Sequence, residues 1–237
     1  MQKINTIEEY QSEYKKSVEN PEAFWAEKAE SFLWKRKWDR VLDWNFEEPK
    51  VKWFDGAQLN ITENCLDRHL ELLGDKTAIL WEPNHPSEAA KHISFKELHK
   101  CVSQFSNVLK SLGLVKGDRI ALYMPMVPEL TIAVLACARI GAIHSVVFAG
   151  FSAKALADRI NDSSCKLLIT ADGSYRGTKV LDLKSIVDLA LESCPSIAQA
   201  IVLERTGSKP HMKAHRDLWW HELIEGVSVV CEATIMD

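Results

Sequence analysis

Two cations, Arg176 and Lys179, flank a glycine in the stretch TADGSYRGTK, which covers residues 170–179. The apolar run CKLLI precedes this stretch, and VLDLKSIVDLALES, which has the spacing of a helix, follows it. The cations therefore lie where a strand hands over to a helix. Guanidinium and ammonium groups beside a strand-end glycine suit a phosphate group, because they supply charge-assisted hydrogen bonds. The alternative is a solvated loop whose charges bind nothing.

A second stretch, VVFAGFS at residues 146–152, also ends an apolar strand pattern. Its glycine, Gly150, lets a ligand approach the backbone, and the N–H groups at the start of the next helix point outward. Ligands of open α/β sheets bind beyond the carboxyl ends of the strands. Both stretches are therefore candidate binding elements, while the structural alternative is that the glycine only marks a helix start.

Strand and helix patterns alternate from residue 76 onward. We predict strands at residues 76–82, 119–125, 142–148, 166–172 and 198–204, and helices at residues 94–113, 128–141, 152–162, 181–193 and 217–226. The first of these helices opens with a capping box, Ser94 to Glu97. Strands that alternate with helices of this length indicate βαβ crossovers. The sequence therefore predicts an α/β fold with a mostly parallel sheet flanked by helices.

The N-terminal part differs from the rest because it holds five of the eight tryptophans, at positions Trp25, Trp34, Trp38, Trp44 and Trp53. Helices are predicted at residues 6–18 and 21–33, the second with Pro21 in its first turn. Such aromatic side chains anchor an arm to a larger body more often than they form a ligand site. We therefore expect a helical, tryptophan-rich arm over residues 1–74 that packs outside an α/β subdomain over residues 75–237. Several of its tryptophans must be buried to offset the entropy of ordering the arm.

Charge and composition exclude several classes of protein. The net charge of −4 argues against a nucleic-acid-binding protein, since such proteins usually carry a basic face. The longest apolar run, LTIAVLACA, is shorter than the roughly 20 residues of a membrane span. The polar N-terminus is unlike a signal peptide, and the scattered cysteines suit reduced thiols. We therefore expect a cytoplasmic protein with no nucleic-acid or membrane partner.

Two histidines, His211 and His215, have the spacing of a pair of metal ligands on one helix face. The segment around them is rich in Lys, Pro and Gly, which is typical of a loop. We expect a solvated loop here and no metal site in the chain.

Residues 121–179, from ALYMPMVPELTIAVLACARIG to LLITADGSYRGTK, resemble the AMP-forming acetyl-coenzyme A synthetases of the acyl-adenylate-forming superfamily. Three further blocks resemble the same family, namely PEAFW (21–25), WFDGAQLNITENCLDRHL (53–70) and GDRIALYMPM (117–126). The resemblance is collinear and covers essentially the whole chain. It implies that the α/β part is the first, incomplete subdomain of a large adenylate-forming domain.

The activity implied by this resemblance has two half-reactions. ATP and acetate give acetyl-adenylate and pyrophosphate, and coenzyme A then releases AMP and forms acetyl-coenzyme A. The family's phosphate-binding Ser/Thr/Gly loop, acetate pocket and adenylating lysine are expected after Asp237, together with the sites for ATP and Mg. No phosphate-loop motif occurs in the 237 residues. The resemblance thus implies an N-terminal part that holds no catalytic residue, contributes to coenzyme A binding and is inactive alone.

The coenzyme A site is the part of the family's machinery that falls within this chain. By resemblance, Arg176, Gly177, Thr178 and Lys179 match the segment that binds the 3′-phospho-ADP end of coenzyme A. Gly150 matches a backbone contact to the coenzyme, and Phe148 matches an aromatic side chain that lies against the adenine. The sequence departs from the family where Lys179 replaces the commoner arginine and Ala149 the commoner glycine. The lysine keeps the charge but loses the bidentate geometry of arginine.

Two alternatives stay open from the sequence. One is a propionyl-coenzyme A synthetase or another short-chain acyl-coenzyme A synthetase, because the acyl pocket is expected outside this chain. The other is a non-catalytic module that binds coenzyme A or a related nucleotide.

Overall fold

The computed structural model describes residues 3–237. This part of the chain forms two compact units, one of residues up to Asn64 with Ile235–Asp237 and one of Cys65–Thr234. The sequence placed its division later, at residue 74. Residues 65–74 fall in the second unit, where the Arg139 guanidinium binds both carboxylate oxygens of Asp67, at 2.8 and 2.9 Å.

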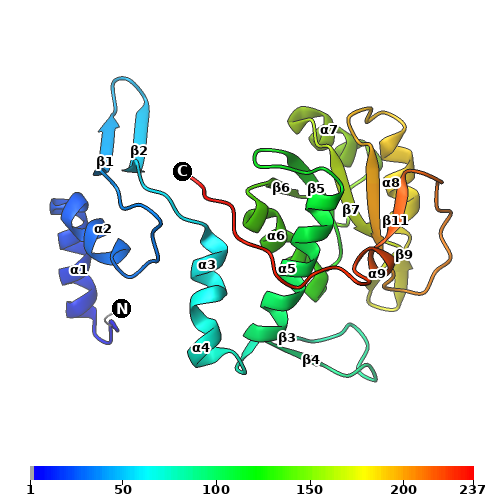
Figure 1. The fold of residues 1–237 in the computed structure, drawn as a ribbon, viewed down its shortest axis with the longest axis horizontal. Helices are drawn as coiled ribbons and strands as arrows, with labels where there is room; N and C mark the ends of the chain where they lie inside the picture. The colour runs from blue at the N-terminus through cyan, green and yellow to red at the C-terminus, as the bar shows by residue number, and fades with distance from the viewer. Residues whose placement is uncertain (1–2) are drawn as a thin grey trace. The chain divides into compact units, whose positions relative to one another are not determined.

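The first unit contains two longer helices, a β-hairpin and most of a short third helix (Figure 1). Its elements are α1 (Ile7–Glu19), α2 (Pro21–Ala29), β1 (Arg40–Asn45), β2 (Lys50–Asp55) and α3 (Ile61–Cys65). The last residue of α3, Cys65, is the first residue of the second unit. The two helices were predicted, but α2 stops four residues early and the antiparallel hairpin was missed. The helix stops because Trp34 folds back, and its Nε1 donates to the carbonyl of Ala29 at 2.8 Å.

The tryptophans of this unit are less buried than expected. Trp34 and Trp38 are half-buried and pack with Phe54, at ring-centroid distances of 5.2 to 5.6 Å. Trp25, Trp44 and Trp53 stay exposed within the described chain. A unit of this size has a high ratio of surface to volume, so it lacks the interior to bury five indole rings.

The second unit is built on a five-stranded sheet in which all neighbouring strands are parallel, which confirms the predicted fold class. The strand order is β11-β10-β7-β5-β6, from β5 (Arg119–Tyr123), β6 (Ile143–Val146), β7 (Leu167–Ala171), β10 (Gln199–Leu203) and β11 (Asp217–Trp219). Successive residues of β5 serve opposite faces. Ile120 and Leu122 belong to one hydrophobic cluster, whereas Ala121 and Tyr123 belong to another.

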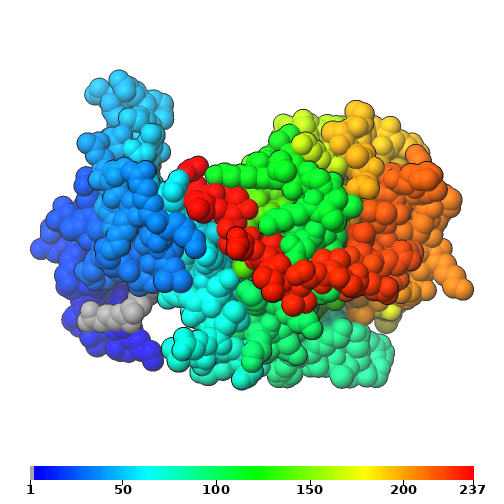
Figure 2. Space-filling view, in the orientation of Figure 1, coloured from blue at the N-terminus to red at the C-terminus, as the bar shows by residue number. Residues whose placement is uncertain are grey.

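Helices cover both faces of this sheet (Figure 1). The first cluster includes residues of α5 (Phe95–Ser111) and α6 (Pro128–Ile140), and the second includes residues of α7 (Ala153–Ser163) and α8 (Leu183–Leu191). The predicted capping box opens α5, and Ser152 caps α7 as expected. The segment after α9 (Trp220–Leu223) lies along α5 in Figure 2, where Gln104 and Asn107 donate to its backbone carbonyls.

Two predicted elements were wrong in part. The helix expected at residues 217–226 begins with strand β11, because Asp217 is buried in ion pairs and residues 217–219 pair with β10. The strand expected at residues 76–82 forms β3 (Thr77–Trp81), which pairs antiparallel with β4 (Lys91–Ser94) and not with the main sheet. The helix expected at 181–193 is present as α8 (Leu183–Leu191), but the sequence missed the short antiparallel hairpin before it, β8 (Ser174–Arg176) and β9 (Lys179–Leu181).

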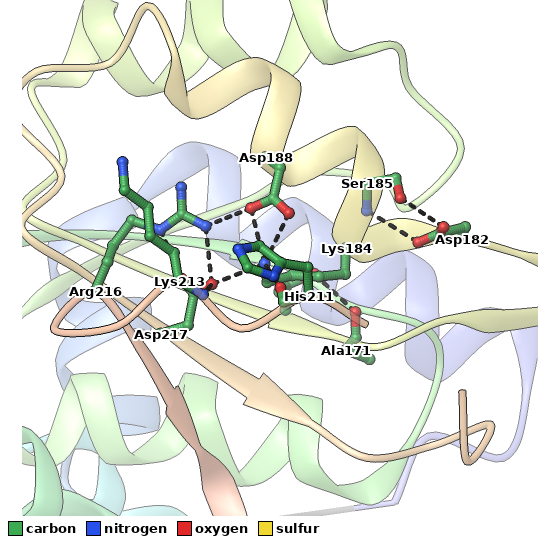
Figure 3. A network of polar contacts seen from close by, with 10 residues as sticks. Ala171, Asp182, Lys184, Ser185, Asp188, His211, Lys213, Arg216 and Asp217 are labelled. Carbon is green, nitrogen blue, oxygen red and sulfur yellow. Dashed lines mark hydrogen bonds and ion pairs between the residues drawn. The ribbon is translucent and has the colours of Figure 1, made fainter. Parts of the chain in front are cut away.

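A buried ionic network joins α8 to β11 (Figure 3). The side chains of Lys184 and Asp217 are 1% and 0% exposed, and they meet at 2.8 Å. Lys184 also contacts Asp188 at 2.7 Å, while Arg216 binds both carboxylates. Burial raises the pKa of Asp217, but the hydrogen bonds from Arg216 and Lys184 outweigh it and hold that pKa below its usual range. The network fixes the edge strand, which has few apolar contacts of its own.

A second buried carboxylate, Asp172, lies directly after β7. Its oxygens accept hydrogen bonds from the N–H groups of Gly173, Arg205, Thr206 and Ser208 and from the hydroxyls of the last two, at 2.6 to 3.2 Å. Burial raises the pKa of Asp172, but these donors outweigh it and lower the pKa from 3.8. The turn after β10 is therefore held to the end of β7.

We predict that Lys184→Met lowers the free energy of unfolding by about 3 kcal/mol, because it leaves buried carboxylates short of a partner. The matched control is Lys154→Met, since Lys154 also pairs with an aspartate four residues on, at 2.7 Å, but with both side chains exposed. The control leaves stability essentially unchanged. Urea unfolding measures both variants, and equal losses would contradict the structural role of the network.

We predict that Asp172→Asn costs about 2–4 kcal/mol near neutral pH, because an amide NH₂ meets donors where the carboxylate accepted. The folded-state pKa of Asp172 is depressed, so the carboxylate stabilises the fold above pH 3.8 and this contribution is lost as pH falls through the lower folded value. The unfolding free energies of wild type and variant therefore converge below about pH 4. Urea unfolding at several pH values checks this, and a constant difference down to about pH 2 would refute it.

Candidate functional site

A cavity of about 560 Å³ opens in the second unit at the carboxyl ends of the strands. Its walls come from residues 124–127 after β5, residues 146–150 at the end of β6, and β8 of the short hairpin. Residues that follow β3 and β10 complete it. The cavity thus lies at the sheet edge where the strand-end rule places ligands.

Phe148 and Gly150 lie together in the wall after β6. The Phe148 side chain is 66% exposed, so its ring is available for stacking. The N–H of Gly150 donates to the Phe148 carbonyl at 2.8 Å, and a Cβ on Gly150 would approach the Phe148 ring to 2.5 Å. A side chain at position 150 would therefore displace the Phe148 ring from its present position. The Tyr123 hydroxyl, which donates to the Phe151 carbonyl at 2.7 Å, holds the following residues in place.

The β8–β9 hairpin brings the two predicted cations face to face. Arg176 and Lys179 are paired across the hairpin, and Gly177 and Thr178 form its turn. Gly177 has φ +59°, as the first position of a type II′ turn requires. Like charges directly opposite one another destabilise a strand pair. Within residues 3–237 no carboxylate lies within ion-pair distance of either cation, so a bound anion would relieve their repulsion.

The structure places some of the predicted site residues in the cavity wall and others outside it. Phe148, Gly150 and Arg176 line the same cavity. Gly177, Thr178 and Lys179 form the turn and the second strand of the hairpin and are not part of the lining. They lie next to the cavity, because β9 is hydrogen-bonded to β8 and Arg176 of β8 lines the cavity.

Sequence reasoning missed Arg205, which also lines the cavity. Its guanidinium binds both oxygens of Glu88, at 3.1 and 3.0 Å. It lies 5.1 Å from the ring centroid of Trp81 and 4.9 Å from that of Tyr175. Arg205 follows the carboxyl end of β10, so the strand-end rule, applied to every strand, would have found it.

A second cavity, of about 620 Å³, lies within the first unit among the side chains of α1 and α2. Its aromatic lining includes Phe24, Trp25 and Trp34, and its Glu13 is paired with Lys16 and Lys28. Hydrogen bonds from the two lysines lower the pKa of Glu13, so no proton-transfer group stands out there.

Among residues 3–237, no three His, Cys, Asp or Glu side chains gather in a way that suits a metal ion. In the same range, no helix combines the length and the apolar run needed to span a bilayer.

Comparison with known proteins gives two family matches that together cover most of the chain. Residues 66–224 match the model of the AMP-binding enzymes. Residues 10–65 match the model of the acetyl-coenzyme A synthetase N-terminus.

Individual relatives agree with these matches. The chain is 48% identical over 229 residues to an acetyl-coenzyme A synthetase of Bdellovibrio bacteriovorus, which covers 96% of this chain and 36% of the relative. It is 49% identical over 232 residues to acetyl-coenzyme A synthetase 2 of Pseudomonas aeruginosa, with 97% and 36% covered. Among solved structures, the acetoacetyl-CoA synthetase from Streptomyces lividans superposes with a TM-score of 0.85 at 25% identity, over 94% of this chain and 33% of that one.

The chain spans about 36% of the length of the synthetases it matches. The matched region includes the parallel sheet, the cavity and the hairpin that carries Arg176. With a family model over most of its length, the chain belongs to the AMP-binding enzymes, as a member with an acetyl-coenzyme A synthetase N-terminus.

Proposed function

We propose that this chain supplies the first third of a cytoplasmic, AMP-forming acetyl-coenzyme A synthetase. The whole enzyme would join acetate to coenzyme A through acetyl-adenylate, with release of pyrophosphate and AMP. Relatives at 48–49% identity named as acetyl-coenzyme A synthetases support this assignment. The residues described above then have a binding role, while ATP, Mg²⁺ and acetate are held by segments outside this chain.

The observation that carries the proposal is the facing pair Arg176 and Lys179 beside a cavity with an exposed aromatic ring. The nucleotide end of coenzyme A presents matching chemistry. Its 3′-phosphate carries roughly −1.5 to −2 charges, as other phosphomonoesters do, and relieves the repulsion between the cations. Its adenine stacks on Phe148, where Gly150 leaves room for the ring to lie as it does.

This site contributes binding and not chemistry. The reactive thiol of coenzyme A is at the opposite end of the molecule from the 3′-phosphate. Contacts to the nucleotide end are therefore the same in the ground state and the transition state, and they lower KM without changing kcat. Chain residues of this site take no part in the adenylation half-reaction.

Acetate is favoured as the acyl substrate over a longer short-chain acid by the names of the relatives. The acetoacetyl-CoA synthetase that shares the fold is only 25% identical to this chain. Propionate, another short-chain acid or a non-catalytic role in nucleotide binding are the alternatives, and a substrate profile of the whole protein separates them.

We expect Arg176→Ala, in the whole synthetase, to raise the KM for coenzyme A about tenfold, because one charge-assisted contact at an open site is lost. The KM values for ATP and acetate and the rate of acetate-dependent ATP–pyrophosphate exchange stay unchanged. Lys154→Ala is the control, because it removes an exposed cation of α7 that is paired with Asp158 on the same helix.

Dephospho-coenzyme A makes this test specific for the phosphate. Wild type prefers the full coenzyme, and Arg176→Ala reduces that preference. If the variant kept the full discrimination, the cations would have no phosphate to bind and the loop would be only solvated.

We also expect the 237-residue chain alone to give no acetate-dependent ATP–pyrophosphate exchange, because its sequence contains no phosphate-loop motif. The assay compares the purified chain with a no-enzyme blank. Exchange above the blank would show that an adenylation site lies within these residues.

A further inference from the structure

The β8–β9 hairpin that carries Arg176 and Lys179 has little support of its own. Each strand has three residues, and the hairpin does not pair with the main sheet. A two-stranded hairpin is at best marginally stable by itself. Its geometry must therefore be set by side-chain contacts with neighbouring segments.

Arg205 provides such a contact. Its guanidinium lies 4.9 Å from the ring centroid of Tyr175, the residue that precedes Arg176 in β8. Because neighbouring residues of a strand point to opposite sides, a contact on Tyr175 holds the hairpin by the side away from the Arg176 side chain. Arg176 stays free for a ligand while its strand is held.

Arg205 is itself fixed both at its backbone and at its guanidinium. Its backbone N–H donates to the buried carboxylate of Asp172 at 2.8 Å. Its guanidinium forms a bidentate pair with Glu88 and lies over the Trp81 ring at 5.1 Å. The Arg205 side chain is 16% exposed, and its charge is already balanced by Glu88, so it is poorly suited to bind a phosphate directly.

The same contacts join the other walls of the cavity. Trp81 Nε1 donates to the Met126 carbonyl at 2.9 Å, in the segment after β5. Asn84, from the segment that also holds Glu88, donates to the Gly177 carbonyl at 2.9 Å in the turn of the hairpin. The hairpin is thus held at its turn by Asn84 and at β8 by Arg205.

We propose that Arg205 is a positioning residue for the phosphate-binding pair, which it acts on through Tyr175 and the β8–β9 hairpin. The proposal rests on the function proposed above for Arg176. A lysine at position 205 would keep the charge but could not fill this role, because it offers neither the planar fork for Glu88 nor the flat face for the rings of Trp81 and Tyr175.

The first test measures the hairpin without any coenzyme. Trypsin, applied to the whole synthetase, cleaves after Arg176 and Lys179 in proportion to the opening of the hairpin. We expect Arg205→Met to raise both cleavage rates about tenfold, with cleavage after Lys154 in α7 unchanged. Lys91→Met is the matched control, since Lys91 lies 5.2 Å from the same Trp81 ring but does not contact Tyr175. Unchanged cleavage in Arg205→Met, or an equal rise in Lys91→Met, would overturn the proposal.

The second test measures coupling in the whole synthetase. We expect Arg205→Lys to raise the KM for coenzyme A about threefold to tenfold, with unchanged KM values for ATP and acetate. In an Arg176→Ala background the same substitution adds less than about twofold, because its effect passes through Arg176. Equal effects in both backgrounds would show that Arg205 acts independently of the pair.

The two tests distinguish the positioning role of Arg205 from the proposed binding of coenzyme A by Arg176. If Arg176→Ala leaves the KM for coenzyme A unchanged, the proposed function is wrong, whatever the trypsin result. If Arg176→Ala raises that KM but the Arg205 variants change neither cleavage nor KM, only the positioning role is wrong.

Discussion

The buried carboxylate of Asp172 is the contact on which the arrangement of the site depends. It directly follows β7, the central strand of the sheet, and accepts hydrogen bonds from six donor groups, most of them in the turn after β10. The next residue must be glycine, because a Cβ on Gly173 would lie 2.9 Å from the Leu181 carbonyl and from Thr206 Oγ1. The start of the hairpin, its end and the turn that carries Arg205 therefore meet at one point.

The charged side chains of the site become more exposed with distance from Asp172. Asp172 is fully buried, Arg205 is mostly buried and neutralised by Glu88, and Arg176 is exposed and without an ion-pair partner in the described chain. Such an order separates rigidity from binding, because the inner charges are satisfied by the protein and the outer ones are left for a ligand. It suits a site that binds the far end of a large substrate and takes no part in bond making.

The sequence predicted the parallel sheet well because its three inner strands, β5, β7 and β10, are buried on both faces and so appear as continuous apolar runs such as those around Leu122 and Ile169. It failed where long-range contacts decide the structure. Asp217 starts a strand because Lys184 and Arg216 bind it, and β8 and β9 are too short for any propensity to reveal. Arg176 was found because it and Lys179 flank a strand-end glycine and because the segment resembles a family motif, whereas the partners of Arg205 are scattered from residue 81 to residue 175 and no local pattern joins them.

A crystal structure of the full-length protein with coenzyme A bound would test the proposed binding site directly. We expect the 3′-phosphate within hydrogen-bond distance of the Arg176 guanidinium, Lys179 beside it, and the adenine against Phe148 in the cavity at the carboxyl ends of β5 and β6. Asp172 and Arg205 would keep the contacts described here. A nucleotide bound elsewhere, with this cavity empty and Arg176 in solvent, would contradict the account.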